Sequence, residues 1–204
     1  KDPDAILAVK YPDERIRKPM VLYFRGKSDE ALRELNKVVN DKKAADLRDR
    51  AEALQRDIFN VRGKYTEGSS LLLQGSVREA ARTWRPVLET DARLVPTNPP
   101  SYFRDEIQRS LAEAYVKAGT SFFDKGRFEE AFEQIKQAVE VAPDNIEVIY
   151  AVRKLKRTAE RMLEDAILSV NPAEAKAKLK AITTMTLPAT AIYKMAEAKL
   201  RDMK

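Results

Sequence analysis

The side chains able to do chemistry in this sequence are carboxylates, amines, guanidinium groups and hydroxyls, because it contains no histidine and no cysteine. That composition excludes imidazole acid–base catalysis, thiolate chemistry, disulfides and cysteine–histidine zinc sites. The sequence also has no phosphate-cradling Gly-rich loop and no nucleophile elbow. Neighbouring carboxylates such as Glu129 and Glu130 point to different sides of a predicted helix, so they form no acid–base pair. The sequence therefore predicts no catalytic, cofactor or metal site.

Basic side chains are the remaining candidates. The formal net charge is +6, from 38 basic and 32 acidic residues. Four of the basic residues lie on one side of a helix predicted over 146–170: Arg153, Lys154, Arg157 and Arg161. That side is opposite an apolar stripe that includes Val152 and Met162, and it is suited to an acidic peptide or a nucleic-acid backbone. Glu160 and Glu164 dilute it, and such a face is more often merely solvated.

Helix formers dominate the chain, and only 6 of its 204 residues are glycine. With 44% hydrophobic residues, it can build a core, yet no stretch approaches the roughly 20 apolar residues of a membrane span. We expect an all-α protein without membrane insertion. The chain begins with Lys1, so we expect it to be a piece of a longer protein. The absence of cysteine favours a cytoplasmic location.

The clearest internal unit covers residues 112–145 and contains two helical patterns separated by Asp124-Lys125-Gly126. Gly126 permits the backbone conformation that turns the chain back, and Pro143 ends the second helix. Small residues stand where the two helices cross closely, and bulky residues stand where the crossing leaves space. The small residues are Gly119, Ala131 and Ala138, and the bulky ones are Tyr115, Phe122 and Phe128.

In its length of 34 residues and in these positions, the unit resembles a tetratricopeptide repeat. The resemblance implies a right-handed superhelix of antiparallel helix pairs, an α-solenoid, over residues 19–204. Weaker copies flank the central repeat, with alanines at 31, 80, 131 and 175, which are 49, 51 and 44 residues apart. The excess over 34 residues predicts elongated first helices.

Other signals define the ends of the elements. Ser76 with Glu79, and Asn171 with Glu174, predict helix starts with capping boxes. Residues 1–18, with two prolines among mixed charges, are predicted to be an irregular N-terminal arm. Residues of about 188–203 are predicted to form a C-terminal capping helix.

The resemblance also implies a partner-binding groove lined by first helices, in which a partner's helix or extended peptide docks. The groove residues carried over by position are Tyr65, Ser69, Leu72, Glu113, Val116, Lys117, Thr120, Phe123, Asp124, Tyr150, Lys154 and Arg157. The family's lysine–asparagine clamp for chaperone C-termini is absent at these positions. We therefore expect a non-enzymatic protein–protein interaction or scaffold module. The alternatives are a homo-oligomerisation or assembly module and, less favoured, a binder of an anionic polymer such as nucleic acid.

Overall fold

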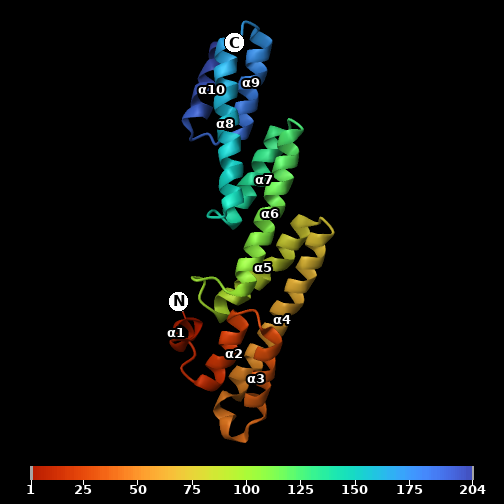
Figure 1. Ribbon diagram of the computed structural model, residues 1–204, viewed down its shortest axis with the longest axis vertical. Helices are drawn as coiled ribbons and strands as arrows, with labels where there is room; N and C mark the ends of the chain where they lie inside the picture. The colour runs from red at the N-terminus through yellow and green to blue at the C-terminus, as the bar shows by residue number, and fades with distance from the viewer. Residues whose placement is uncertain (1, 204) are drawn as a thin grey trace. The chain divides into compact units, whose positions relative to one another are not determined.

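The computed structural model describes residues 2–203 and confirms the predicted all-α class, since no described residue lies in a β-strand. Its helices form two compact units, Lys1–Gln108 and Arg109–Lys204, where the sequence predicts one domain over 19–204. Lys1 and Lys204 themselves lie outside the described residues. The first unit contains α1 (Pro3–Ala8), α2 (Glu14–Phe24), α3 (Ser28–Asn40), a 3-10 helix (Lys42–Leu47), α4 (Arg48–Leu73), α5 (Val77–Leu94) and the start of α6 (Tyr102–Asp124) (Figure 1). The second contains the rest of α6, α7 (Phe128–Val141), α8 (Ile146–Leu168), α9 (Pro172–Met185) and α10 (Ala191–Asp202).

Three turns between successive helices share one geometry. Gly26, Gly75 and Gly126 adopt left-handed φ values of +81°, +81° and +72°. At the last of them, the N–H of Gly126 donates to the Phe123 carbonyl and the N–H of Arg127 to the Phe122 carbonyl, both at 2.9 Å. These two bonds satisfy carbonyls that the end of a helix leaves unpaired, and they turn the chain back on itself. The predicted turn at Gly126 is confirmed.

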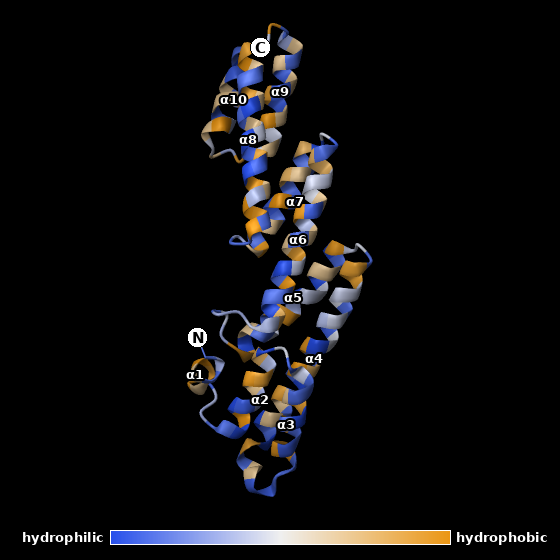
Figure 2. Cartoon of the chain, viewed as in Figure 1, coloured by the Kyte–Doolittle hydropathy of each residue, from blue (hydrophilic) through white to orange (hydrophobic). Residues whose placement is uncertain are grey.

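The helix that follows each turn buries the same register. Ala31, Ala80 and Ala131 are fully buried, and the residues four positions later, Leu35, Trp84 and Ile135, are buried as well. After α8, Ala175 and Leu179 of α9 repeat this pattern. The buried residues recur four positions apart because they must lie on one side of a helix. Hydrophobic and hydrophilic residues accordingly alternate along the helices (Figure 2).

The N-terminal arm predicted to be irregular is instead helical. Asp2 accepts a hydrogen bond from the N–H of Asp4, and Pro3 occupies the first helical position, where its missing N–H costs nothing. Asp13 caps α2 in the same way. Buried side chains hold the segment in place, among them Leu7, Tyr11 and Ile16.

The two predicted capping boxes differ in outcome. Asn171 caps α9 by accepting from the N–H groups of Ala173 and Glu174, with Pro172 at the first position. Ser76 stands before α5 but its side chain makes no capping bond. Its ψ of 62° follows from the preceding glycine turn, whereas a capping side chain needs extended backbone.

A buried polar network joins three helices of the first unit. Asp91 near the end of α5 is fully buried, and its carboxylate accepts from the Tyr23 hydroxyl at 2.9 Å and the Ser101 hydroxyl at 2.6 Å. Arg104 on α6 completes the network, with its Nε 3.1 Å from the same carboxylate. Burial and the Asp91 charge raise the pKa of Tyr23 well above its ordinary value.

The second unit has two hydrophobic clusters, and α8 contributes to both. Near its start, Val148 packs with Ala112 and Ala138. Further along, Ala159, Leu163 and Ala166 pack with buried residues of α9 and α10. The middle of α8 therefore lies between two packed regions, and this position leaves one of its faces open.

Candidate functional site

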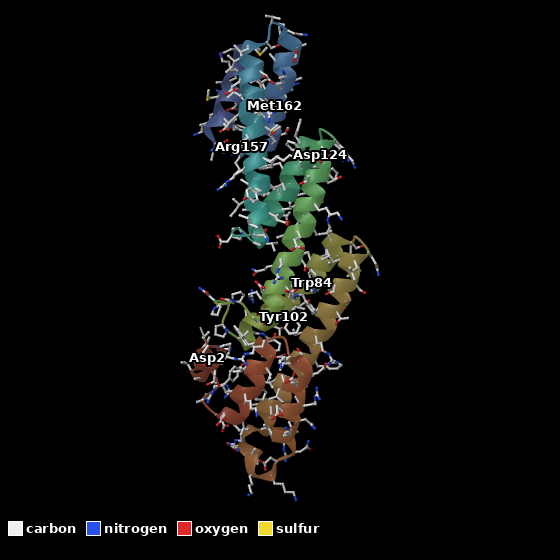
Figure 3. All side chains as sticks on the ribbon, in the orientation of Figure 1. Asp2, Trp84, Tyr102, Asp124, Arg157 and Met162 are labelled. Carbon is white, nitrogen blue, oxygen red and sulfur yellow. The ribbon has the colours of Figure 1, made fainter. Side chains whose placement is uncertain are left out.

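A concavity of about 870 Å³ lies against the open face of α8 in the second unit. It is bounded on one side by the turn between α6 and α7 and on the other by α8. Figure 3 shows Asp124 at the tip of the α6–α7 hairpin, and Arg157 and Met162 on α8. The lining residues are Phe123, Asp124, Phe128, Tyr150, Arg153, Lys154, Arg157, Thr158, Arg161, Met162 and Asp165. We call this concavity the α8 groove.

Helical periodicity explains why eight of these residues share one wall. From Tyr150 to Asp165, successive members are alternately three residues and one residue apart along α8. Residues three and four positions apart lie on the same side of a helix that has 3.6 residues per turn. The wall is therefore a single continuous face of α8.

The floor of the groove is apolar. The rings of Phe123 and Phe128 meet edge to face, with centroids 5.5 Å apart. Phe128 and Met162 are half-buried, and both pack against the cluster formed by α8, α9 and α10. Because this floor rests on a packed core, its shape is largely set before any ligand arrives.

Lys154 of α8 contacts the tip of the α6–α7 hairpin. Its ammonium group lies 3.2 Å from Asp124 Oδ1 and 4.4 Å from the centroid of the Phe123 ring. At the other end of the wall, Asp165 lies 3.6 Å from Lys178 of α9, which also binds Glu174 at 2.8 Å. The hydrogen bond with Glu174, and the charge of Asp165, raise the pKa of Lys178. Both carboxylates that line the groove therefore already have a lysine partner.

Three arginines form the outer rim of the groove. Arg153, Arg157 and Arg161 are exposed, and no carboxylate among residues 2–203 lies within 4.0 Å of their guanidinium groups. They follow one another at four-residue intervals, and like charges at this spacing destabilise a helix by roughly 0.2–0.5 kcal/mol per pair. The rim is thus a cationic stripe whose guanidinium groups form no ion pair within residues 2–203.

The structure brings five of the predicted groove residues together. Phe123, Asp124, Tyr150, Lys154 and Arg157 all line the α8 groove. Four others are on α6 of the same unit but do not line it: Glu113, Val116, Lys117 and Thr120. Val116 packs instead against the cluster of Ala112, Ala138 and Val148.

The remaining three predicted residues, Tyr65, Ser69 and Leu72, belong to α4 in the first unit. The Tyr65 ring packs against Phe103 and Trp84, with centroids 5.0 Å and 6.2 Å away. Its carbonyl accepts from the Trp84 indole N–H at 3.0 Å and from the Ser69 hydroxyl at 2.8 Å. Tyr65 and Ser69 therefore support the aromatic core of that unit.

Sequence reasoning did not place Phe128, Arg153, Thr158, Arg161, Met162 or Asp165 in the groove. The periodicity of α8 held a signal for most of them, because they continue the face of Tyr150, Lys154 and Arg157. Phe128 and Met162 were predicted as core residues, and both do contact the core while also lining the floor. Met162 was also predicted on the side of α8 opposite the arginines, which is wrong, because it lines the same groove as they do.

A second, apolar groove of about 640 Å³ lies elsewhere on the same unit, between α7, α8 and the α9–α10 connection. Its walls include Ile135, Val139, Val152, Leu187 and Ile192. Val152, predicted as part of the buried stripe of α8, is 40% exposed there.

Comparison with known protein families, with characterised proteins and with solved structures finds no match to this chain. Among residues 2–203, no helix is long and apolar enough to cross a lipid bilayer. Over the same residues, no three acidic side chains gather closely enough to hold a metal ion.

Proposed function

We propose that this chain is a non-enzymatic protein-interaction module of the tetratricopeptide type, and that a segment of a partner protein docks in the α8 groove. The observation that carries the proposal is the combination of an apolar aromatic floor with an unpaired cationic rim on rigid helices. Aromatic and arginine side chains in a preformed concavity are the groups that contribute most to binding energy in protein interfaces.

The repeated helix hairpins support the tetratricopeptide interpretation. Three glycine turns share one φ region, and the helix after each buries an alanine at the same position. We propose that the hairpins continue as a right-handed superhelix, in which the first helix of each pair faces the partner. In this arrangement α6 and α8 are first helices, and both line the groove.

Peptide selection on the intact chain tests the proposal. A random peptide library is enriched on the wild type, and selected peptides are measured by fluorescence anisotropy on a Phe123→Ala, Tyr150→Ala double variant. Truncating Tyr150, which is 61% exposed, leaves the core intact. The matched control is Phe59→Ala in the first unit, because Phe59 is also 61% exposed. Circular dichroism verifies that each variant is folded.

We expect selected peptides to lose at least about ten-fold in affinity on the double variant, because its two aromatic side chains supply much of the groove's contact area. They should bind the Phe59→Ala control like the wild type. Peptides that bind all three proteins equally would show that the α8 groove is not the binding site, and the proposal would fail.

Self-association is a second candidate function, favoured by the second groove. Its apolar walls include Val139, Val152 and Leu187, which are 37%, 40% and 51% exposed. If a second copy covers this surface, sedimentation velocity should show a dimer that becomes monomeric in a Val139→Lys, Val152→Lys variant. A wild type that is monomeric at high micromolar concentration removes this candidate.

A further inference from the structure

We infer that the segment bound in the α8 groove is an acidic amphipathic helix, with carboxylates repeated every four residues opposite Arg153, Arg157 and Arg161. This inference rests on the proposed function and specifies the chemistry of its partner. Three features of the groove carry it: the charge of the rim, the spacing of the arginines, and the position of the rim beside the floor.

The charge of the rim is available to bind an external anion. Asp124 and Asp165 are already held by Lys154 and Lys178, at 3.2 Å and 3.6 Å. The three rim arginines have no such partner within residues 2–203. A guanidinium group binds a carboxylate with two parallel hydrogen bonds, which is the strongest pairing open to it in a protein partner.

The spacing of the arginines matches a helix. Four residues of α-helix rise about 6.0 Å, so Arg153, Arg157 and Arg161 sample about 12 Å of α8. A partner helix aligned with α8 and carrying Asp or Glu at i, i+4 and i+8 repeats the same interval. An extended segment with acids at alternate residues advances about 6.6–6.8 Å per step and leaves this register by more than 1 Å over two steps.

The arrangement of rim and floor also favours a helix. Floor residues Phe128 and Met162 lie beside the arginine rim in one concavity. A helix can present an acidic stripe and an apolar stripe on adjacent faces, so it contacts rim and floor together. Alternate side chains of a strand point in opposite directions, so a strand with acids on one face directs its apolar residues away from the floor.

Single-stranded nucleic acid fits the groove less well. Such ligands need aromatic faces on which bases can stack. Lys154 covers the Phe123 ring, and Phe128 is half-buried against Phe123 and the core. Tyr150 is left as the only largely exposed aromatic ring among the described lining residues. A single stacking platform does not match a multi-base strand.

Three synthetic peptides test the inference by fluorescence anisotropy. The first is a 16-residue alanine-based helix with Glu at i, i+4 and i+8 and an adjacent leucine stripe. The second has the same composition in scrambled order, and the third replaces the glutamates by lysine. We expect the first to bind at least about ten-fold tighter than the second, and the third not to bind. Affinity should also fall as salt rises, because exposed charges are screened over about 10 Å at 0.1 M and about 3 Å at 1 M.

A charge swap at Arg157 distinguishes direct contact with the peptide from a structural role, because a structural role would not make affinity depend on the charge of the peptide. Arg157→Glu should lower the affinity for the acidic peptide by at least about ten-fold, since a charge-assisted pair becomes a repulsive one. A peptide with lysine at its central acidic position should bind Arg157→Glu better than it binds the wild type. The matched control is the Lys176→Glu, Lys180→Glu variant of α9, because both lysines are exposed and outside the groove. It should change affinity by less than about two-fold.

The possible results separate this inference from the proposed function. If library-selected peptides lose binding on the aromatic double variant but are neither acidic nor sensitive to Arg157→Glu, the groove is confirmed and the acidic helix is overturned. Equal binding of the scrambled peptide overturns the helical register. If a 12-nucleotide single-stranded DNA binds tighter than the acidic peptide, and Arg157→Glu abolishes that binding, the protein partner is overturned in favour of nucleic acid.

Discussion

Replacing Asp91 tests the energetics of the buried network in the first unit. The side chain of Asp91 is fully buried and that of Arg104 is 13% exposed, with 3.1 Å between Asp91 Oδ2 and Arg104 Nε. Asp91→Ala removes the acceptor of Tyr23, Ser101 and Arg104 at once and leaves the guanidinium charge uncompensated. Breaking a buried pair in this way costs about 3–5 kcal/mol. With a urea m-value of about 1.5 kcal/mol/M, the unfolding midpoint should fall by about 2–3 M.

The fluorescence of Trp84 is a specific assay for this change. Trp84 is the only tryptophan of the chain and is buried in the first unit, so its urea transition reports that unit. The matched control is Glu67→Gln, which breaks an ion pair with Lys64 at 2.7 Å in which both side chains are 52% exposed. Exposed pairs contribute about 1 kcal/mol at most, so its midpoint should move by less than about 0.7 M.

The double variant Asp91→Ala, Arg104→Met separates the effect of the orphaned charge from the loss of packing. Removing the guanidinium as well should restore part of the lost stability, because the uncompensated buried charge is then gone. If Asp91→Ala unfolds at the same midpoint as Glu67→Gln, or if the double variant is less stable than Asp91→Ala alone, the reasoning about the buried charge is refuted.

Three further predictions concern the fold. Burial raises the pKa of Tyr11 to about 12, so folding favours the protonated phenol. The stability that this adds is complete below about pH 10 and is lost as the pH rises to 12. Urea unfolding followed by Trp84 fluorescence should therefore show a smaller loss of stability at alkaline pH in Tyr11→Phe than in the wild type. Gly68→Ala should lower the urea midpoint, because its new Cβ would lie 2.6 Å from Cδ1 of buried Trp84, an overpacking worth about 1–3 kcal/mol. The new Cβ of Gly63→Ala on the same helix meets no atom within 4 Å. This variant should raise the urea midpoint, because alanine stabilises a helix interior by about 0.5–1 kcal/mol relative to glycine; both variants moving in the same direction would contradict this. Leu179→Ala, in the core of the second unit, should lower the free energy of unfolding of that unit by about 2–5 kcal/mol. The unfolding seen by circular dichroism should then begin at lower urea while the Trp84 transition stays unchanged, and a parallel shift of both would show that the units unfold together.

The hairpins could be predicted from the sequence because their signals are local. A left-handed turn requires glycine for steric reasons, so Gly126 indicates the turn whatever surrounds it. The alanine that lies five residues later must be small because the paired helices cross there. Asn171 and Pro172 define the start of α9 locally, because the Asn171 side chain accepts from the N–H groups of Ala173 and Glu174 and Pro172 has no N–H to satisfy.

Other features depend on contacts that are distant in the sequence. The six-residue helix α1 is too short to be stable by propensity, and it forms where Leu7 is buried in the first unit. The division into two units follows from which helices pack together, which no local pattern records. The Ser76 cap failed because the Gly75 turn sets the backbone at Ser76, a conflict between two local rules in which the turn prevails.

The candidate site was predictable along α8 but not across the groove. Tyr150, Lys154 and Arg157 follow from helical periodicity on one element. Bringing Phe128 and Met162 into one floor requires the position along α8 at which the α6–α7 hairpin ends. The sequence gives no signal for that position, whereas the structure locates it through the contact between Asp124 and Lys154.

The length of α8 is the physical origin of the groove. α8 has 23 residues, whereas α7 and α9, which pack beside it, have 14 each. One short neighbour therefore cannot cover α8 from end to end: its start packs with α6 and α7 and its later part with α9 and α10. Between these regions the hairpin tip at Asp124 stops against Lys154, and the face from Tyr150 to Asp165 remains open. The extra length of α8 relative to α7 and α9 thus produces the concavity, and shortening α8 by two turns should remove it together with its rim.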